Sequence, residues 1–365
     1  MISVLKSKWR EYVLLVISIV TTLVISEYGL RYLLFSNISI AQSSRDPGLF
    51  ANNNYDDDYW KLWVIFDPNT RLISKNQLHP KRFDPKLGYV NSEVSEKSYV
   101  HRDAKKINGK IPVLLYGDSY AECNVPEKNC FQGILNSNPD FADQYYLINY
   151  GVGGYGLDQI YLLYKESINN YENPVVIFSL LEHDMDRTIL KFRQVPKPYF
   201  EVIGGQLMLQ GVPVERFTDD YLLRHPPEIN CYLWRLFTRG FLPIPWSEFK
   251  AAKKKTISKA ILVEVNEDLK ARNLRHLFLV FQGIKAPGRT LSWREEFLTN
   301  LFDEHKMEYL LTQRILEQRV NESDFDKRHY VISKDDDHPN RTFNLLVTEA
   351  ILKWLKKESS IIDSE

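Results

Sequence analysis

The sequence has 365 residues, of which 44% are hydrophobic and 13% aromatic, enough for one large domain with a buried core or for one domain plus an appendage. Lysine plus arginine and aspartate plus glutamate number 47 each, so the formal net charge is zero. Nucleic-acid binding usually requires a basic face and is therefore not expected. The sequence has no glycine-rich phosphate-binding loop and no zinc-type spacing of cysteine and histidine, so we expect neither a cofactor nor a metal.

An uncharged apolar segment, residues 12–26, follows three basic residues near the N-terminus. Its helical length of about 22 Å is less than the roughly 30 Å of a bilayer core. The apolar pattern resumes after Glu27, so one helix over about residues 11–35 would cross a membrane, with Arg31 reaching the far interface. The basic residues favour a cytoplasmic N-terminus. A cleaved signal peptide is the main alternative, and it also delivers the rest of the chain outside the cytoplasm; a buried helix of a soluble protein is the third.

The next part of the chain, residues 36–105, is polar and irregular, with aromatic patches at residues 59–66 and 87–90. We interpret it as a membrane-proximal extension that packs on the main domain. It has too little apolar periodicity to suggest an independent domain.

From about residue 110, apolar strands alternate with amphipathic helices. This alternation predicts a parallel sheet covered by helices on both faces. A glycine pair, Gly204-Gly205, predicts a hairpin within an insertion at about residues 199–249, either a lid, a substrate-recognition element or a surface excursion. The expected strands are residues 111–116, 145–149, 174–180 and 276–282, the hairpin is 200–203 with 206–209, and the expected helices are 158–170, 293–302 and 343–356.

The three cysteines are Cys123, Cys130 and Cys231. The first two are close in sequence and could form a disulfide in an oxidising compartment or remain reduced thiols. Spacing alone does not decide between these states.

The tripeptide Gly117-Asp118-Ser119 follows the first expected strand. In parallel α/β sheets, ligands bind at the carboxyl edge, where such a serine would lie. Glycine permits a sharp turn, and the residues after it can open a helix whose free N–H groups favour negative charge. The motif therefore predicts a nucleophile with its oxyanion site, and Asp335-Asp336-Asp337-His338 supplies a histidine and an aspartate for a Ser-His-Asp set.

Over about residues 110–355, the chain resembles the SGNH/GDSL hydrolase superfamily, in particular membrane-anchored bacterial members associated with extracellular polysaccharide. The matching segments run from Gly117 to Tyr120, from Asn149 to Gln159 and from Asp335 to Asn340. The order and separation of the three segments make the resemblance more specific than any one of them.

The resemblance implies a role for each matching residue. Ser119 would be the nucleophile, His338 the general base and Asp335 the carboxylate that orients the imidazole. The backbone N–H groups of Ser119 and Gly154 would bind the oxyanion, and a glycine suits the second position because it lets the backbone approach the substrate. Alternatives without catalysis also fit these residues. The aspartates could stabilise a helix N-terminus or bind a cation with His338, and the glycines could form a loop that has no binding site.

One segment departs from the family pattern. The family usually has Gly-x-Asn-Asp after the third strand, whereas this chain has Leu181-Glu-His-Asp-Met-Asp-Arg187. Counting from the strand places His183 at the asparagine position, and a shift of one residue places Asp184 there. Histidine can donate a hydrogen bond and ionised aspartate cannot, so we expect His183 to be the third oxyanion donor, although a hydrogen-bonded surface role also fits.

The sequence thus predicts an α/β fold, a three-layer α/β/α sandwich of flavodoxin-like style, preceded by one transmembrane helix. The expected divisions are an anchor at residues 1–35, an extension at 36–105 and a hydrolase-like domain at 106–358. The expected function is a serine esterase on acyl, especially acetyl, esters of an extracytoplasmic polysaccharide. A polysaccharide O-acyltransferase and an inactive glycan-binding or assembly protein are the alternatives. The expected partners are an acylated glycan or other ester substrate, and the membrane through the N-terminal helix.

Overall fold

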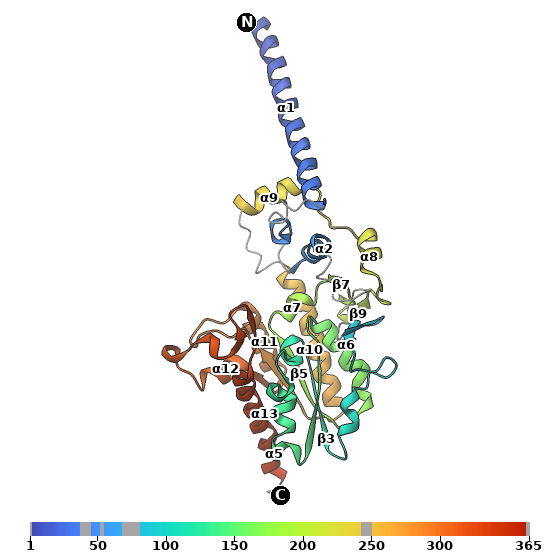
Figure 1. The fold of residues 1–365 in the computed structure, drawn as a ribbon, viewed down its shortest axis with the longest axis vertical. Helices are drawn as coiled ribbons and strands as arrows, with labels where there is room; N and C mark the ends of the chain where they lie inside the picture. The colour runs from blue at the N-terminus through green and yellow to red at the C-terminus, as the bar shows by residue number, and fades with distance from the viewer. Residues whose placement is uncertain (1, 37–44, 52–54, 68–80, 242–249, 363–365) are drawn as a thin grey trace. The chain divides into compact units, whose positions relative to one another are not determined.

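Five parallel strands form the central sheet in the order β11-β10-β5-β3-β4. The computed structural model describes residues 2–36, 45–51, 55–67, 81–241 and 250–362 (Figure 1). The strands are runs of apolar residues buried on both faces, which is the pattern of a sheet covered on two sides. Their bounds are β3 Ile111–Gly117, β4 Tyr145–Gly151, β5 Val175–Leu181, β10 His276–Phe281 and β11 Tyr309–Leu311. The predicted fold class is confirmed.

The strand order places a topological switch between β3 and β5. The chain passes from β3 outward to β4, then returns to β5 on the other side of β3 and continues to β10 and β11. All the pairings are parallel, so the carboxyl ends of β3 and β5 lie at one edge of the sheet. Ligands of open α/β sheets bind outside such a switch point.

Helices cover both faces of the sheet (Figure 1). On one face, β3, β5 and β10 share an apolar cluster with α4 (Phe131–Asn136), α12 (Thr312–Glu317) and α13 (Arg341–Ile362). On the other face, aromatic rings cross the sheet at one register level, from Phe278 through Phe178 and Tyr116 to Tyr150. The helices that cover this face are α6 (Leu157–Ser167), α10 (Ala251–Ala271) and α11 (Trp293–Glu304), the last through Phe302 stacked on Phe278.

Among the described residues, three antiparallel hairpins accompany the sheet, besides the short pair of Phe192–Arg193 with Val195–Pro196. They are β1 (Lys81–Asp84) with β2 (Gly88–Asn91), β8 (Tyr199–Ile203) with β9 (Gln206–Gln210), and β12 (Val331–Ser333) with β13 (Asp336–Pro339). The second confirms the hairpin predicted from Gly204-Gly205, both of which have positive φ angles. The short elements between are α3 (Ser119–Glu122), α5 (Pro139–Ala142), α7 (Asp184–Arg187), β6 (Phe192–Arg193) and β7 (Val195–Pro196).

The chain divides into two compact units. A sheet unit contains Lys75–Lys191, Pro196–Arg216 and Lys250–Glu365, and an anchor unit contains Met1–Ser74, Phe192–Val195 and Phe217–Phe249. The expected divisions at residues 35, 105 and 358 remain interpretations of the sequence. Within the expected insertion, the β8–β9 hairpin belongs to the sheet unit, whereas α8 (Thr218–Arg224) and α9 (Tyr232–Phe241) belong to the anchor unit.

The anchor unit begins with α1 (Ile2–Phe35), a helix of 34 residues. Its segment Lys8–Phe35 is long and apolar enough to cross a membrane. The last turns of α1 pack with α2 (Asp57–Phe66) and α9 in a small core. The core residues are Leu34, Phe50, Ala51, Leu62, Ile229 and Tyr232.

Candidate active site

The tight turn after β3 places Ser119 at the carboxyl edge of the sheet. Asp118 caps α3, because its Oδ1 accepts a hydrogen bond from the N–H of Tyr120 at 2.9 Å. Ser119 is the first residue of α3. Gly117 makes this turn sterically feasible, since a Cβ there would overlap the hydroxyl of Ser179 and the Cβ of Ala121.

His338 lies between Ser119 and an aspartate. Its Nε2 is 2.9 Å from Ser119 Oγ, and its Nδ1 is 2.6 Å from Asp336 Oδ1. The same carboxylate oxygen accepts the backbone N–H of His338 at 3.0 Å. Partial burial raises the pKa of Asp336, but these bonds and the charge of His338 outweigh it and lower that pKa below its ordinary value. The carboxylate is therefore ionised while it orients the imidazole.

The carboxylate bonded to His338 is that of Asp336, whereas the sequence pointed to Asp335. Asp335 is exposed in the turn between β12 and β13, and its N–H bonds to Ser333 Oγ. Asp336 and His338 are two apart in β13, so their side chains share one face of the strand. A carboxylate three residues before the histidine would lie on the opposite side in an extended segment. This spacing is the physical reason that His338 bonds to Asp336 and not to the expected Asp335.

Tyr120 fixes the histidine hairpin to the helix of the nucleophile. Its hydroxyl donates to the backbone oxygen of Asp337 at 3.2 Å, and its ring centroid is 5.3 Å from that of His338. The side chain of Asp337 pairs instead with Lys327 at 2.6 Å. Of the three consecutive aspartates, one therefore faces His338, one pairs with a surface lysine and one lies in the turn.

The glycine segment after β4 passes beside the nucleophile. A Cβ built on Gly153 would lie 3.5 Å from the Cβ of Ser119, and Gly154 has a φ of +90°. The Gly153 N–H donates to Glu122 Oε2 at 2.6 Å, and its carbonyl accepts from Lys81 Nζ at 2.9 Å. These two bonds hold the loop in place next to Ser119. The oxyanion role expected for the Gly154 N–H stays a prediction.

The ring of His183 is turned toward carboxylates at both nitrogens. Nδ1 is 3.2 Å from Asp186 Oδ2, and Nε2 is 3.8 Å from Glu182 Oε1. The physical cause is local, since α7 starts directly after His183 and brings the side chain three residues later over it. Asp186 is in turn paired with Lys254 and Arg294 at 2.7 and 2.8 Å. This geometry does not aim His183 at the nucleophile, so the structure gives no support to its expected donor role.

In the segment from Leu181 to Arg187, the side chain of Arg187 contacts Asp118, the residue before Ser119. Its Nη1 donates to Asp118 Oδ2 at 2.9 Å, to Asp184 Oδ1 at 2.6 Å and to the carbonyl of Tyr155 at 3.1 Å. Asp118 Oδ2 is also 3.4 Å from Ser119 Oγ. Burial opposes the charge of Arg187, but Asp184 and Asp118 outweigh it and raise the pKa of the guanidinium. The alternative donor Asp184 is fully buried and acts as an acceptor, from Arg187 and from the N–H of Leu181.

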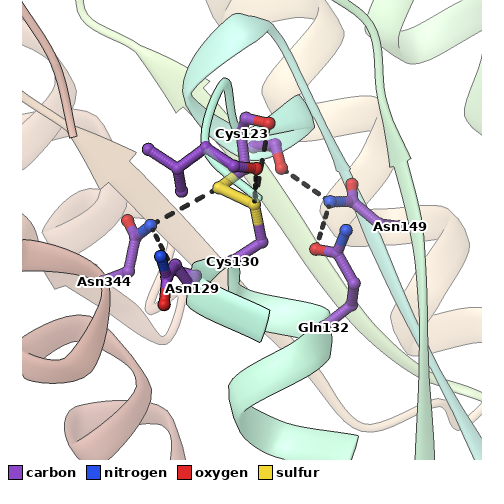
Figure 2. Close-up of a disulfide and its surroundings, with 8 residues drawn as sticks. Cys123, Asn129, Cys130, Gln132, Asn149 and Asn344 are labelled. Carbon is purple, nitrogen blue, oxygen red and sulfur yellow. Dashed lines mark hydrogen bonds between the residues drawn. A yellow bond between two sulfur atoms is a disulfide. The ribbon is translucent and has the colours of Figure 1, made fainter. Parts of the chain in front are cut away.

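A disulfide closes the loop that follows the nucleophile (Figure 2). Cys123 and Cys130 are bridged with a Cα–Cα distance of 5.8 Å, while Cys231 is free. Two asparagines hold the loop from either side. Asn149 at the end of β4 donates to the carbonyl of Ala121 at 2.7 Å, and Asn344 of α13 donates to that of Asn129 at 2.9 Å.

The site can therefore deliver a serine nucleophile with a paired base. Ser119 and His338 are brought together as expected from the sequence. The bond between His338 and Asp336 and the pairing of Arg187 with Asp118 were not foreseen. The contact between Asp336 and His338 could have been predicted from their spacing of two residues, which puts both side chains on one face of a strand. No sequence pattern predicts the contact between Arg187 and Asp118, because it depends on how α7 folds. Within the described ranges, no three His, Cys, Asp or Glu side chains are grouped to hold a metal ion.

No protein-family model and no curated protein matches the sequence. Among solved structures, the chain is similar to the acetyl xylan esterase AlAXEase, with 16% identity and a TM-score of 0.38 over 68% of this chain and 100% of that one. It is similar to the acetylxylan esterase Axe2 from Geobacillus stearothermophilus, with 12% identity and a TM-score of 0.36 over 67% and 94%. A third is a protein described as lipolytic and of the G-D-S-L family, from Desulfitobacterium hafniense, with 11% identity and a TM-score of 0.37 over 67% and 99%. The chain is thus similar, over about two thirds of its length, to solved acetyl xylan esterases and to a solved protein of the G-D-S-L family.

Proposed function

We propose that this protein is a serine ester hydrolase that uses Ser119, His338 and Asp336. The observation that carries the proposal is the continuous hydrogen-bonded series from the Ser119 hydroxyl through both ring nitrogens of His338 to Asp336. A serine hydroxyl is a weak nucleophile without such a base. The motifs around Ser119 and His338, which resemble those of SGNH/GDSL hydrolases, support the same function.

In the proposed reaction, Ser119 Oγ attacks the acyl carbonyl carbon while its proton passes to His338 Nε2. Asp336 stabilises the imidazolium that forms. The N–H groups of Ser119 and Gly154 would bind the oxygen that becomes negative. The intermediate collapses to an acyl-serine, and His338 returns the proton to the leaving alcohol. Water, activated by the same histidine, then releases the carboxylic acid and restores the serine.

Arg187 has a positioning role in this scheme. Asp118 is a fully buried carboxylate next to the nucleophile, and an unbalanced negative charge there would oppose an oxyanion. The guanidinium of Arg187 pairs with Asp118 and Asp184 together. We propose that the positive charge of Arg187 offsets the negative charge of Asp118 and so favours the oxyanion at Ser119. It would thereby replace the stabilisation that the asparagine amide of the family pattern would supply.

The proposed substrate is an acetyl or other short acyl ester of an extracytoplasmic polysaccharide. The support is the apolar N-terminal helix, the disulfide beside the site, which suits an oxidising compartment, and the kind of family the motifs resemble. If a sugar hydroxyl replaces water in the second half of the reaction, the same residues would perform acyl transfer.

A fluorophosphonate probe tests the proposal directly. The detergent-solubilised full chain should be labelled at Ser119 and should hydrolyse p-nitrophenyl acetate, and Ser119→Ala should lose both activities while keeping its melting temperature. A wild-type protein that folds but neither reacts with the probe nor hydrolyses the ester would support the inactive binding protein instead. Release of acetate with and without an added oligosaccharide would separate hydrolysis from transfer.

A further inference from the structure

The anchor unit exposes a second apolar surface besides α1. In α9, Trp234 and Phe237 are 60% and 51% exposed, and their rings are stacked with centroids 5.9 Å apart. They are three residues apart and therefore lie on one side of the helix. Tyr232, at the start of the same helix, is buried in the core of the anchor unit. One side of α9 thus packs inward while large aromatic side chains point to the outside.

Polar contacts fix the start of α9 to a definite level of α1. The carboxylate of Glu27 accepts the backbone N–H groups of Tyr232 and Leu233 at 3.0 and 2.7 Å. Arg31, one turn later on α1, donates to the carbonyl of Asn230 at 2.8 Å and lies 4.9 Å from the ring of Tyr232. The first turn of α9 therefore lies beside residues 27–31 of α1. Figure 1 shows α9 next to the C-terminal end of α1.

That level of α1 has the character of a membrane–water boundary. The apolar, outward-facing stretch ends at Glu27, and the exposed side chains that follow include Tyr28 and Tyr32. At the other end of the stretch, the exposed aromatic residues are Trp9 and Tyr12. About 20 residues separate the midpoints of these two aromatic groups, or roughly 30 Å of helix, which equals the hydrocarbon thickness. Tyrosine and tryptophan concentrate at both interfaces of membrane proteins.

We propose that α9 is an interfacial helix that lies on the bilayer crossed by α1, with Trp234 and Phe237 inserted among the lipids. Continuity with α1 identifies a phospholipid surface as the occupant of this apolar face, because the exposed aromatics of α9 start where the lipid-facing part of α1 ends. Arg235, on the same short helix and partly exposed, suits contact with headgroup phosphates. The inference does not depend on the esterase proposal.

Depth-dependent quenching in nanodiscs tests this inference. In a Cys231→Ser background, a full-length Phe237→Cys variant is labelled with the environment-sensitive fluorophore NBD, after which doxyl-labelled phospholipid is added. The emission should shift to the blue and should be quenched. The matched control is Ile203→Cys, at an exposed position on the hairpin of the sheet unit, which should show neither effect. Equal and weak quenching at both positions would overturn the proposal.

A second measurement avoids the engineered cysteine. Full-length wild type and Trp234→Phe are compared in nanodiscs of brominated phosphatidylcholine, where bromine quenches tryptophan that contacts the acyl chains. The wild type should lose a larger share of its tryptophan emission than Trp234→Phe, because Trp9 is common to both. The same fractional loss in the two proteins would show that Trp234 stays in water, whether or not a protein partner covers it in the cell.

Discussion

Asp335 and Asp336 are adjacent and chemically identical, yet only Asp336 faces the imidazole of His338. The difference comes from backbone conformation, because residues two apart in a strand share a face. The sequence predicted the nucleophile and the histidine, since each follows from its motif. It could not predict the carboxylate, because the β12–β13 hairpin was not foreseen and the family pattern placed it three residues before the histidine.

The first prediction compares these neighbours. Asp336→Ala should lower kcat by roughly 10²–10⁴-fold, because the imidazole loses the group that fixes its tautomer and stabilises its cation. Asp335→Ala removes the same charge from the same triplet and should leave kcat near the wild-type value. Hydrolysis of p-nitrophenyl acetate by both variants checks this. An equal loss in the two, or a larger loss in Asp335→Ala, would return the orienting role to Asp335.

The second prediction separates Arg187 from His183. Arg187→Ala should reduce kcat more than His183→Ala does, because Arg187 neutralises the carboxylate next to Ser119, whereas both ring nitrogens of His183 face carboxylates. Removing one partner of a buried ion pair also costs stability, about 3–5 kcal/mol. The decisive readout is therefore rescue, in which added guanidinium ion should restore part of the kcat of folded Arg187→Ala. If guanidinium has no effect and His183→Ala is the slower enzyme, the oxyanion site includes His183.

At the scale of elements, the strands were the best predicted part of the fold. Four of the five central strands are long apolar runs, whereas β11 has only the three residues Tyr309–Leu311 and was missed. The helix α10 was also missed, although Ile257, Ile261, Val265 and Leu269 recur every fourth residue and are buried. Its lysine-rich first turns concealed this stripe. Such a helix can be found from periodicity but not from composition.

The third prediction concerns the start of α11. Ser292 and Glu295 form a capping box, and Arg289 and Gln282 also bond the Glu295 carboxylate. Burial raises the pKa of Glu295, but Arg289 and Ser292 outweigh it and lower the pKa to about 2 from an ordinary 4.5. The stabilisation is thus complete above about pH 5 and is lost as the pH falls toward 2, and it amounts to about 3 kcal/mol.

Thermal unfolding of the full chain in detergent measures this effect. Glu295→Gln cannot ionise, so the wild type should melt at a higher temperature than Glu295→Gln at pH 6. The difference should shrink steadily between pH 5 and pH 2. A difference that stays constant over that range would mean that the carboxylate charge of Glu295 does not stabilise the helix. Glu296→Gln, at the next position of α11, serves as the control for a simple loss of charge.

At the scale of the whole molecule, the chain combines a sheet unit that carries the candidate site with an anchor unit that begins with α1. The apolar N-terminal segment was predicted from the sequence because hydropathy over such a length is a strong signal. The membership of α8 and α9 in the anchor unit was not, because it depends on contacts between residues about 200 positions apart, such as Glu27 with Tyr232. Long-range packing of this kind leaves no periodic trace in the sequence.

The last prediction concerns topology. The full chain should remain in the membrane fraction after washing with high salt, because salt screens charge but does not release a helix held by apolar contact with lipid, as is proposed for α1. Protease added to the outer side of the cytoplasmic membrane should digest the sheet unit, since the lysines and arginine before the apolar stretch favour a cytoplasmic N-terminus.

The state of the cysteines gives an independent test of the same topology. Alkylation of the denatured, unreduced protein should modify Cys231 alone, and reduction should expose Cys123 and Cys130 as well. A cytoplasmic protein marker must stay intact in the same sample. Protection of the sheet unit together with three free thiols would place it in the cytoplasm, and the proposal of an extracytoplasmic glycan substrate would then have to be abandoned even if Ser119 reacts with the fluorophosphonate.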